Sequence, residues 1–154
     1  MASNPFVNLI AAQKTAVKAA RAAGQLMRAN WHLPKRVKAV DAHDIKLELD
    51  VRCQKLIEKI LRASFRQIPL LGEEGDSGNV NAEYRWVVDP IDGTVNYFFG
   101  MPHAAVSIAL QHRGKSVVGV IYDPFTDEIW TTTQGRPARL NGKVVRVSNR
   151  AKIR

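Results

Sequence analysis

The sequence predicts an α+β fold in which two N-terminal helices pack on a mainly antiparallel β-sheet. Apolar residues recur at helical spacing from Phe6 to Trp31 and again from about Ile45 to Phe65. From about Pro69 the pattern changes to short extended runs separated by turn signals, and strands joined by short turns pair antiparallel. A hydrophobic fraction of 45% and a charged fraction of 24% over 154 residues are ordinary for one globular domain and exclude a disordered chain.

Each predicted helix has one apolar stripe that faces the sheet. In the first helix the stripe comprises Phe6, Ile10, Val17, Ala20, Gly24, Met27 and Trp31. Leu33-Pro34 ends this helix, and residues 35–43 are interpreted as a polar connection. Asp44 is the expected N-cap of the second helix, and Asp50 lies near its start. The inward side chains of the second helix are Cys53, Leu56, Ile57, Ile60, Leu61, Ser64 and Phe65.

The predicted strands are short and lie close together along the chain. They are Ile68–Leu71, Tyr84–Asp89, Ala104–Gln111, Ser116–Tyr122, Glu128–Thr132, Ala138–Leu140 and Lys143–Val147. The turn signals between them include His112–Lys115, Asp123–Asp127 and the two-residue hairpin signal Asn141-Gly142.

The net charge of +9 is unevenly distributed, because residues 67–112 are acidic and both flanking segments are basic. The basic flanks are interpreted as a solvated face or as a surface that attracts anionic substrates or nucleic acid. The single cysteine, Cys53, is expected to be a core thiol and suits a reducing compartment, so we expect a cytoplasmic protein. No apolar run approaches the roughly 18 residues of a membrane span, so no membrane partner is expected.

The acidic segment contains the stretch that organises the chain, residues 87–97. A strand through Val88 brings Asp89 and Asp92 to its C-terminal end, and Pro90 holds the backbone between them. Two carboxylates facing one point suit Mg²⁺, which takes oxygen ligands. Should a helix open at Gly93 and Thr94, their N–H groups would point at an anion beside that cation.

These residues resemble the motifs of the inositol monophosphatase family of Mg²⁺-dependent, lithium-sensitive phosphatases. The motif Asp-Pro-Ile-Asp-Gly-Thr-Val-Asn-Tyr occupies residues 89–97, and Gly-Glu-Glu-Gly precedes it at residues 72–75. The similarity runs from the first helix to about Ser148 and includes residues 104–109 and 119–124. It implies the first half of the layered α/β sugar-phosphatase fold and hydrolysis of inositol monophosphate or a related sugar or polyol phosphate by two- or three-metal-assisted water attack.

The resemblance also assigns roles to single residues. It implies that Glu73, Asp89 and the main-chain carbonyl of Ile91 hold one Mg²⁺ and that Asp89 and Asp92 share a second. The implied catalytic residues are Thr94, Asp50 and Glu73, where Thr94 and Asp50 activate the attacking water. The implied substrate-binding residues are Asp92, Gly93 and Thr94.

Some positions depart from the family pattern or keep a second interpretation. Lys46-Leu47 replaces the usual Val-Thr ahead of Asp50, which leaves open that Asp50 is a helix-surface acid. Val95 and Gly75 stand where Thr and Ser are common. Glu74 is expected to be solvated or to support a ligand. The histidines, His32, His43, His103 and His112, match no metal-binding spacing and are expected to be non-catalytic.

Family members are nearly twice as long, and a Trp-Asp motif in their second half completes the second metal site. Here Trp130 is followed by Thr131, so we expect residues 1–148 to form the N-terminal domain, 149–154 a tail, and the C-terminal domain to be absent. Alone, this chain is expected to be weak or inactive and to expose a sheet face or edge that favours association. The expected partners are a phosphorylated polyol or sugar and the missing domain, and a homodimer stays open.

The alternative function is a non-catalytic basic module that binds RNA or a transcription complex, since some bacterial relatives are accessory factors in transcription. The sequence lacks the aromatic platforms and Gly-rich motifs of dedicated RNA binders, which disfavours a nucleic-acid partner.

Overall fold

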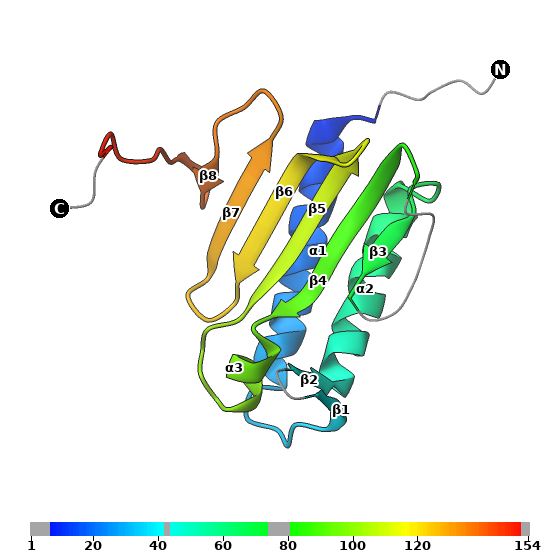
Figure 1. Cartoon of the computed structure of the whole chain (residues 1–154), viewed down its shortest axis with the longest axis vertical. Helices are drawn as coiled ribbons and strands as arrows, with labels where there is room; N and C mark the ends of the chain where they lie inside the picture. Colours follow the sequence, from blue (N-terminus) through cyan, green and yellow to red (C-terminus); the bar gives the residue numbers. More distant parts are fainter. Residues whose placement is uncertain (1–6, 42–43, 74–80, 152–154) are drawn as a thin grey trace.

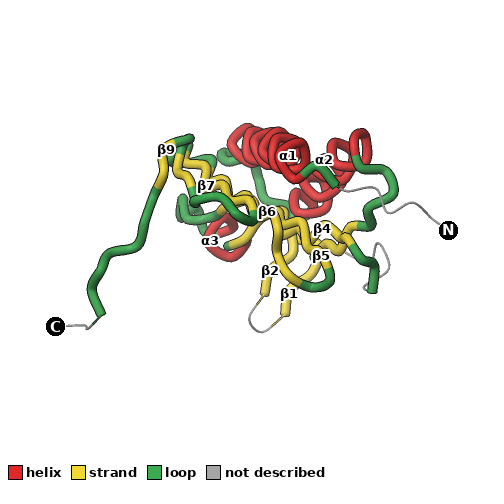
Figure 2. Tube along the Cα trace, turned by 90° about the horizontal axis from the view of Figure 1, so that it is seen from above, coloured by secondary structure: helices red, strands yellow, loops and turns green. Residues whose placement is uncertain are grey.

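A computed structural model describes residues 7–41, 44–73 and 81–151, with the side chains of residues 40, 41 and 44 left out. Two long helices, α1 (Leu9–Ala29) and α2 (Glu48–Ser64), lie side by side on one face of a seven-stranded sheet (Figures 1 and 2). The predicted α+β architecture is therefore confirmed. Among the described residues, no helix combines the length and apolar character needed to cross a membrane.

The face of α1 that packs on the sheet is rich in small residues. Asn8 caps the helix at Leu9, because its side chain accepts hydrogen bonds from the N–H groups of Ile10 and Ala11. Phe6 of the predicted stripe lies outside the described residues. The predicted stripe is only partly correct, since Ile10 and Val17 are half-buried. Small side chains let the helix approach the sheet closely. The fully packed face consists of Ala12, Ala16, Ala19, Ala20, Ala23, Gly24 and Met27.

A small hairpin, β1 (Val37–Asp41) paired with β2 (Asp44–Leu47), precedes α2 and was not predicted. Residues 35–43 are therefore not simply a polar connection, and Asp44 is not the N-cap of α2. The helix starts at Glu48 because the Asp50 carboxylate accepts a hydrogen bond from the N–H of Leu47, at 2.7 Å. The hairpin projects on the side of the sheet opposite to the two long helices (Figure 2).

The strands of the large sheet lie in the order in which they occur along the chain. Each described pair is antiparallel except the first, in which β3 runs parallel to β4. A short helix, α3 (Thr94–Phe98), follows β4 directly. The strands are β3 (Leu70–Gly72), β4 (Tyr84–Asp92), β5 (Ala105–His112), β6 (Lys115–Asp123), β7 (Glu128–Thr133), β8 (Arg139–Leu140) and β9 (Lys143–Val144). The predicted strands agree within a few residues, and the main differences are the longer β4 and the much shorter β9.

The core lies between the helices and the inner face of the sheet. Trp86, Ile108 and Leu110 of neighbouring strands are buried against it, and Cys53 of α2 is a buried free thiol, as predicted. Burial raises the pKa of this thiol to about 12, so it stays protonated. Tyr97 fixes α3 to α1, because its hydroxyl donates to the carbonyl oxygen of Met27 at 2.8 Å. This contact orients the segment that follows β4.

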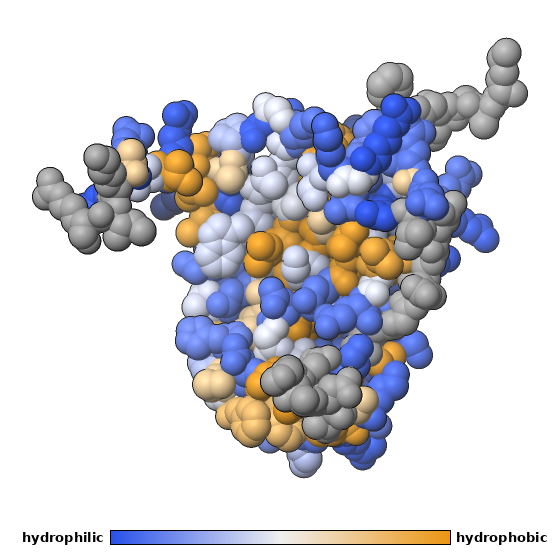
Figure 3. Space-filling view, viewed as in Figure 1, coloured by the Kyte–Doolittle hydropathy of each residue, from blue (hydrophilic) through white to orange (hydrophobic). Residues whose placement is uncertain are grey.

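The other face of the sheet carries an apolar patch (Figure 3). The register places Leu71, Val87 and Ala109 in one row on this face, and Ile121 lies in the next row with 47% of its surface exposed. In the described part of the chain this face has no helix layer (Figure 2). An open sheet face is therefore present, as the sequence predicts.

Candidate functional site

A β-bulge in β4 brings Asp89 and Asp92 to the same face of the sheet. In a regular strand, residues three apart point to opposite faces. Here Asp89 pairs with Ser107 and Asp92 with Ala105, so three steps along β4 match two steps along β5. The extra residue falls at Pro90-Ile91, where a missing N–H suits a bulge. The two carboxylates therefore share the open face of the sheet.

The parallel pair β3–β4 places Glu73 beside Asp89. Parallel neighbours end at the same edge of a sheet. Gly72 pairs with Val88, and the N–H of Glu73 donates to the carbonyl oxygen of Val88 at 3.3 Å. Glu73 thus leaves β3 at the point where Asp89 leaves the regular part of β4, and the three predicted ligand acids converge from two strands.

The environment of Asp89 disfavours its charged form. Burial raises the pKa of Asp89 to about 7, and the charge of Glu73, a side-chain hydrogen bond with Glu73 and the charge of Asp92 act in the same direction. The hydrogen bond from the N–H of Ile91 to the Asp89 carboxylate, at 3.2 Å, acts in the opposite direction. A cation bound between these acids would offset their mutual repulsion.

Thr94 and Asp50 form a hydrogen-bonded pair next to these acids. The Thr94 hydroxyl lies 3.0 Å from Asp50 Oδ1 and 2.8 Å from the carbonyl oxygen of Ile91, and it can donate to one of them at a time. Asp50 is 3% exposed, so its interpretation as a helix-surface acid is wrong. Because Oδ2 of Asp50 holds the start of α2, Oδ1 is fixed facing Thr94.

Gly93 makes the turn from β4 into α3. Its φ is +93°, and a Cβ at this position would lie 2.7 Å from the carbonyl oxygen of His103. A short helix does open at Thr94, so Asp92 and Thr94 lie on either side of one sharp turn.

We expect Gly93→Ala to lower the free energy of unfolding by roughly 1–3 kcal/mol, because the methyl group meets backbone that cannot rotate away. Urea unfolding measures this change. Gly100→Ala is the matched control, since Gly100 also has a positive φ of +76° but no atom within 4 Å of a built Cβ. If both variants lose the same free energy of unfolding, the close approach to the His103 carbonyl oxygen does not destabilise Gly93→Ala.

The predicted ligand and substrate-binding residues line one pocket of about 250 Å³. Its lining comprises Glu73, Asp89, Ile91, Asp92, Gly93, Thr94, Val95 and Asn96. Within residues 7–41, 44–73 and 81–151, no three acidic, histidine or cysteine side chains form a ready metal cage. Glu73 and Asp92 are exposed, and the Glu73 side chain is hydrogen-bonded to Asp89. Glu74 and Gly75 lie outside the described residues.

The sequence profile of the inositol monophosphatase family matches residues 10–154. The chain belongs to this family. An inositol monophosphatase 2 from Solanum lycopersicum is 39% identical over 143 residues, which are 90% of this chain and 54% of that protein. The Nus factor SuhB of Escherichia coli K12 is 38% identical over 148 residues, 94% of this chain and 53% of its own length.

The fold agrees with this membership in the inositol monophosphatase family. The crystal structure of extragenic suppressor protein suhB from Bartonella henselae superposes with a TM-score of 0.86 at 34% identity, over 91% of this chain and 55% of that one. The chain thus spans about half the length of the relatives it matches and corresponds to the N-terminal half of inositol monophosphatase structures.

Sequence reasoning about this pocket missed Asn96. Its side-chain amide donates to the carbonyl oxygen of His103 at 2.9 Å, which ties α3 to the loop before β5. The sequence did offer a sign of this role. Asparagine side chains near the start of a helix commonly form hydrogen bonds with nearby backbone groups, and Asn96 follows Thr94 by two residues. Val95, a departure from the usual Thr, lines the same pocket.

Proposed function

We propose that this chain is the N-terminal part of a Mg²⁺-dependent phosphomonoesterase that hydrolyses inositol monophosphate or a related sugar or polyol phosphate. The observation that carries the proposal is the Thr94–Asp50 hydrogen bond at the edge of a pocket lined by three acids, Glu73, Asp89 and Asp92. A buried base behind a hydroxyl, next to oxygen ligands, is the arrangement that water attack on a phosphate ester requires.

The donor set of the pocket fits Mg²⁺. It offers carboxylate oxygens from Glu73, Asp89 and Asp92 and the carbonyl oxygen of Ile91, with no sulfur or imidazole among its lining residues. We assign Glu73, Asp89 and Ile91 to one cation and Asp89 with Asp92 to a second. Bound Mg²⁺ would lower the pKa of water and neutralise charge on the phosphoryl oxygens.

The proton leaves the attacking water through Thr94. The threonine oxygen accepts that proton only as its own hydroxyl proton passes to Oδ1 of Asp50, 3.0 Å away. Burial of Asp50 excludes bulk water from this relay. Glu73 would act beside the water as a metal ligand and catalytic carboxylate. Asp92, Gly93 and Thr94 contact the substrate from the turn that they form.

We propose that the catalytic centre is complete only when the C-terminal half found in longer relatives is present. Residues 1–148 form the N-terminal domain, 149–154 a tail, and the apolar open face of the sheet packs against the other half. The acids after Asp92 are Asp123, Asp127 and Glu128, and none of them lines the pocket. We propose that a carboxylate of the C-terminal half found in longer relatives completes the second cation site.

A fusion tests this proposal. Residues 1–148 joined to the C-terminal half of the Solanum lycopersicum inositol monophosphatase 2 should release phosphate from inositol 1-phosphate at least about 100-fold faster than the unfused chain, in a Mg²⁺-dependent manner. The same fusion carrying Asp89→Asn is the control. A folded, Mg²⁺-binding fusion that releases no phosphate contradicts the proposal.

The second candidate is a non-catalytic module that contacts RNA or a transcription complex. The observation in its favour is the 38% identity to a protein named Nus factor SuhB, together with the net charge of +9. RNA binding that weakens steeply with salt, in a fusion that lacks Mg²⁺-dependent phosphate release, supports this second candidate over the first.

A further inference from the structure

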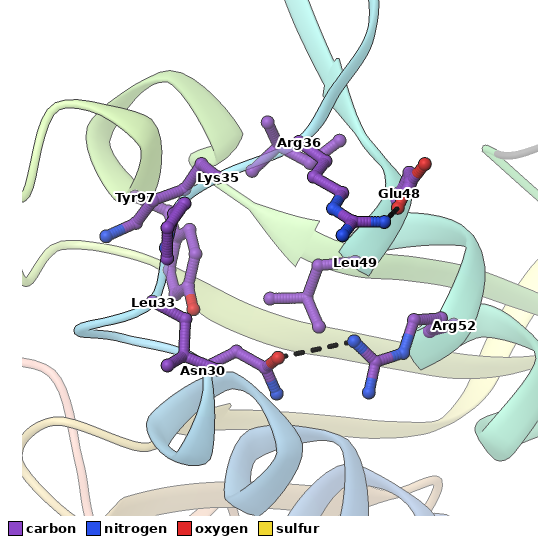
Figure 4. A pocket seen from close by; sticks show the side chains of 10 residues that line it. Asn30, Leu33, Lys35, Arg36, Glu48, Leu49, Arg52 and Tyr97 are labelled. Atoms are coloured by element: carbon purple, nitrogen blue, oxygen red, sulfur yellow. Dashed lines mark hydrogen bonds and ion pairs between the residues drawn. The ribbon is translucent and has the colours of Figure 1, made fainter.

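A second pocket, of about 330 Å³, shares no lining residue with the acidic one. It is enclosed by the end of α1 at Asn30, the turn that follows at Leu33–Arg36, the first turn of α2 and Tyr97 of α3 (Figure 4). Its volume falls at the lower end of the range of small-molecule sites.

The floor of this pocket is apolar and its rim is basic. Leu47, Leu49 and Tyr97 are buried and form the floor. The charged lining residues are the basic Lys35, Arg36 and Arg52 and the acidic Glu48. The rim therefore carries an excess of positive charge over an apolar base.

The two arginines keep hydrogen-bonding capacity for a ligand. Nη1 of Arg36 lies 3.9 Å from the Glu48 carboxylate, and both side chains are largely exposed, so this pair is weak. Nη1 of Arg52 donates to the neutral Asn30 side chain at 3.2 Å. Each guanidinium has five N–H donors, so these contacts leave most of them available. Figure 4 shows the two side chains on one side of the pocket with Leu49 between them.

The Lys35 side chain extends away from the centre of the pocket (Figure 4). Its ammonium group donates to the carbonyl oxygen of Trp31 and lies 5.2 Å from the Trp31 ring and 5.6 Å from the Tyr97 ring. These contacts occupy the ammonium group, so Arg36 and Arg52 are the cations that face the pocket.

We propose that this pocket binds a small organic oxyanion, with a phosphate or carboxylate group between Arg36 and Arg52 and a compact apolar body over Leu49 and Tyr97. Planar guanidinium groups match both anions through paired N–H donors, and the apolar floor selects against a fully hydrated ion. The site is distinct from the proposed phosphatase centre, whose lining is acidic.

Titration of the 154-residue chain with three probes in the absence of divalent cations tests the site. Phenyl phosphate combines both features, inorganic phosphate offers charge alone, and phenol offers the ring alone. We expect phenyl phosphate to bind at least about 10-fold tighter than either other probe, with NMR shift changes at Leu49, Arg52 and Tyr97.

The double variant Arg36→Gln/Arg52→Gln should bind phenyl phosphate about 10-fold or more weakly than the unaltered chain, which corresponds to loss of charge-assisted hydrogen bonds. Lys55→Gln/Lys59→Gln is the matched control, because it removes two exposed cations from α2 outside the pocket and should leave binding unchanged. NMR spectral dispersion verifies that each variant is folded. Equal weakening in both double variants, or shift changes confined to Asp89, Asp92 and Gly93, would overturn the proposal.

Discussion

Thr94→Ala should lower phosphate release by roughly 10²- to 10⁴-fold in the fusion with a C-terminal half, while Mg²⁺ binding persists. The expected loss follows from the geometry, because the Thr94 hydroxyl is the group that connects the pocket to Oδ1 of Asp50. Asp50→Asn should have an effect of similar size. An asparagine oxygen still accepts from the N–H of Leu47, so α2 keeps its start, but the amide cannot take a proton from Thr94.

Initial rates and Mg²⁺ titration by calorimetry, measured on the same preparations, separate catalysis from metal binding. Glu58→Gln is the control for Asp50→Asn, since it neutralises another acid of α2, one that pairs with Arg62 at 2.7 Å away from the pocket lining. If Thr94→Ala loses Mg²⁺ binding to the same extent as turnover, the role of Thr94 is structural rather than catalytic.

Mg²⁺ should stabilise the chain against heat more strongly at pH 8 than at pH 6. The pKa of Asp89 is raised to about 7, so this group favours the folded state at low pH and that contribution is lost as the pH rises through 7. Mg²⁺ requires the ionised carboxylate, so its affinity increases over the same interval. At a Mg²⁺ concentration ten times the Kd, stabilisation is about 1.4 kcal/mol, or roughly 3–6 °C in Tm.

Asp89→Asn should abolish this Mg²⁺-dependent rise in Tm at both pH values, as scanning calorimetry can measure. Asp127→Asn is the control, because Asp127 pairs with Arg21 at 3.1 Å and does not line the acidic pocket. A rise in Tm that survives unchanged in Asp89→Asn would show that the cation binds elsewhere.

The sequence predicted the two helices and the mainly antiparallel strands because these depend on local patterns, and the family motif pointed to the acids that line the pocket. Spacing of apolar residues, turn signals and the motif around Asp89 and Asp92 are all visible within short stretches. The convergence of the two acids was expected from the rigidity of Pro90, whereas the structure shows a β-bulge as the reason. Bulges depend on the partner strand, so a single strand's sequence gives little sign of them.

The β1–β2 hairpin was missed because its register depends on the rest of the fold. Ile45 and Leu47 fit the apolar spacing of the following helix as well as the alternation of a strand. The choice between the two is made by Asp50, whose carboxylate fixes the N–H of Leu47 and so begins the helix at Glu48. The pocket with Arg36 and Arg52 was not visible for a similar reason, since it forms only when the end of α1, the start of α2 and α3 pack together.

The sequential order of strands has a consequence for how the chain folds. From β4 to β9 each strand pairs with the next, so this part of the sheet forms by closing short loops, which costs little chain entropy. The contact between Asp50 and Thr94 joins residues 44 positions apart and requires α2 to dock against the finished strands. Folding kinetics should therefore show the sheet gaining protection from amide exchange before the Thr94–Asp50 contact is made.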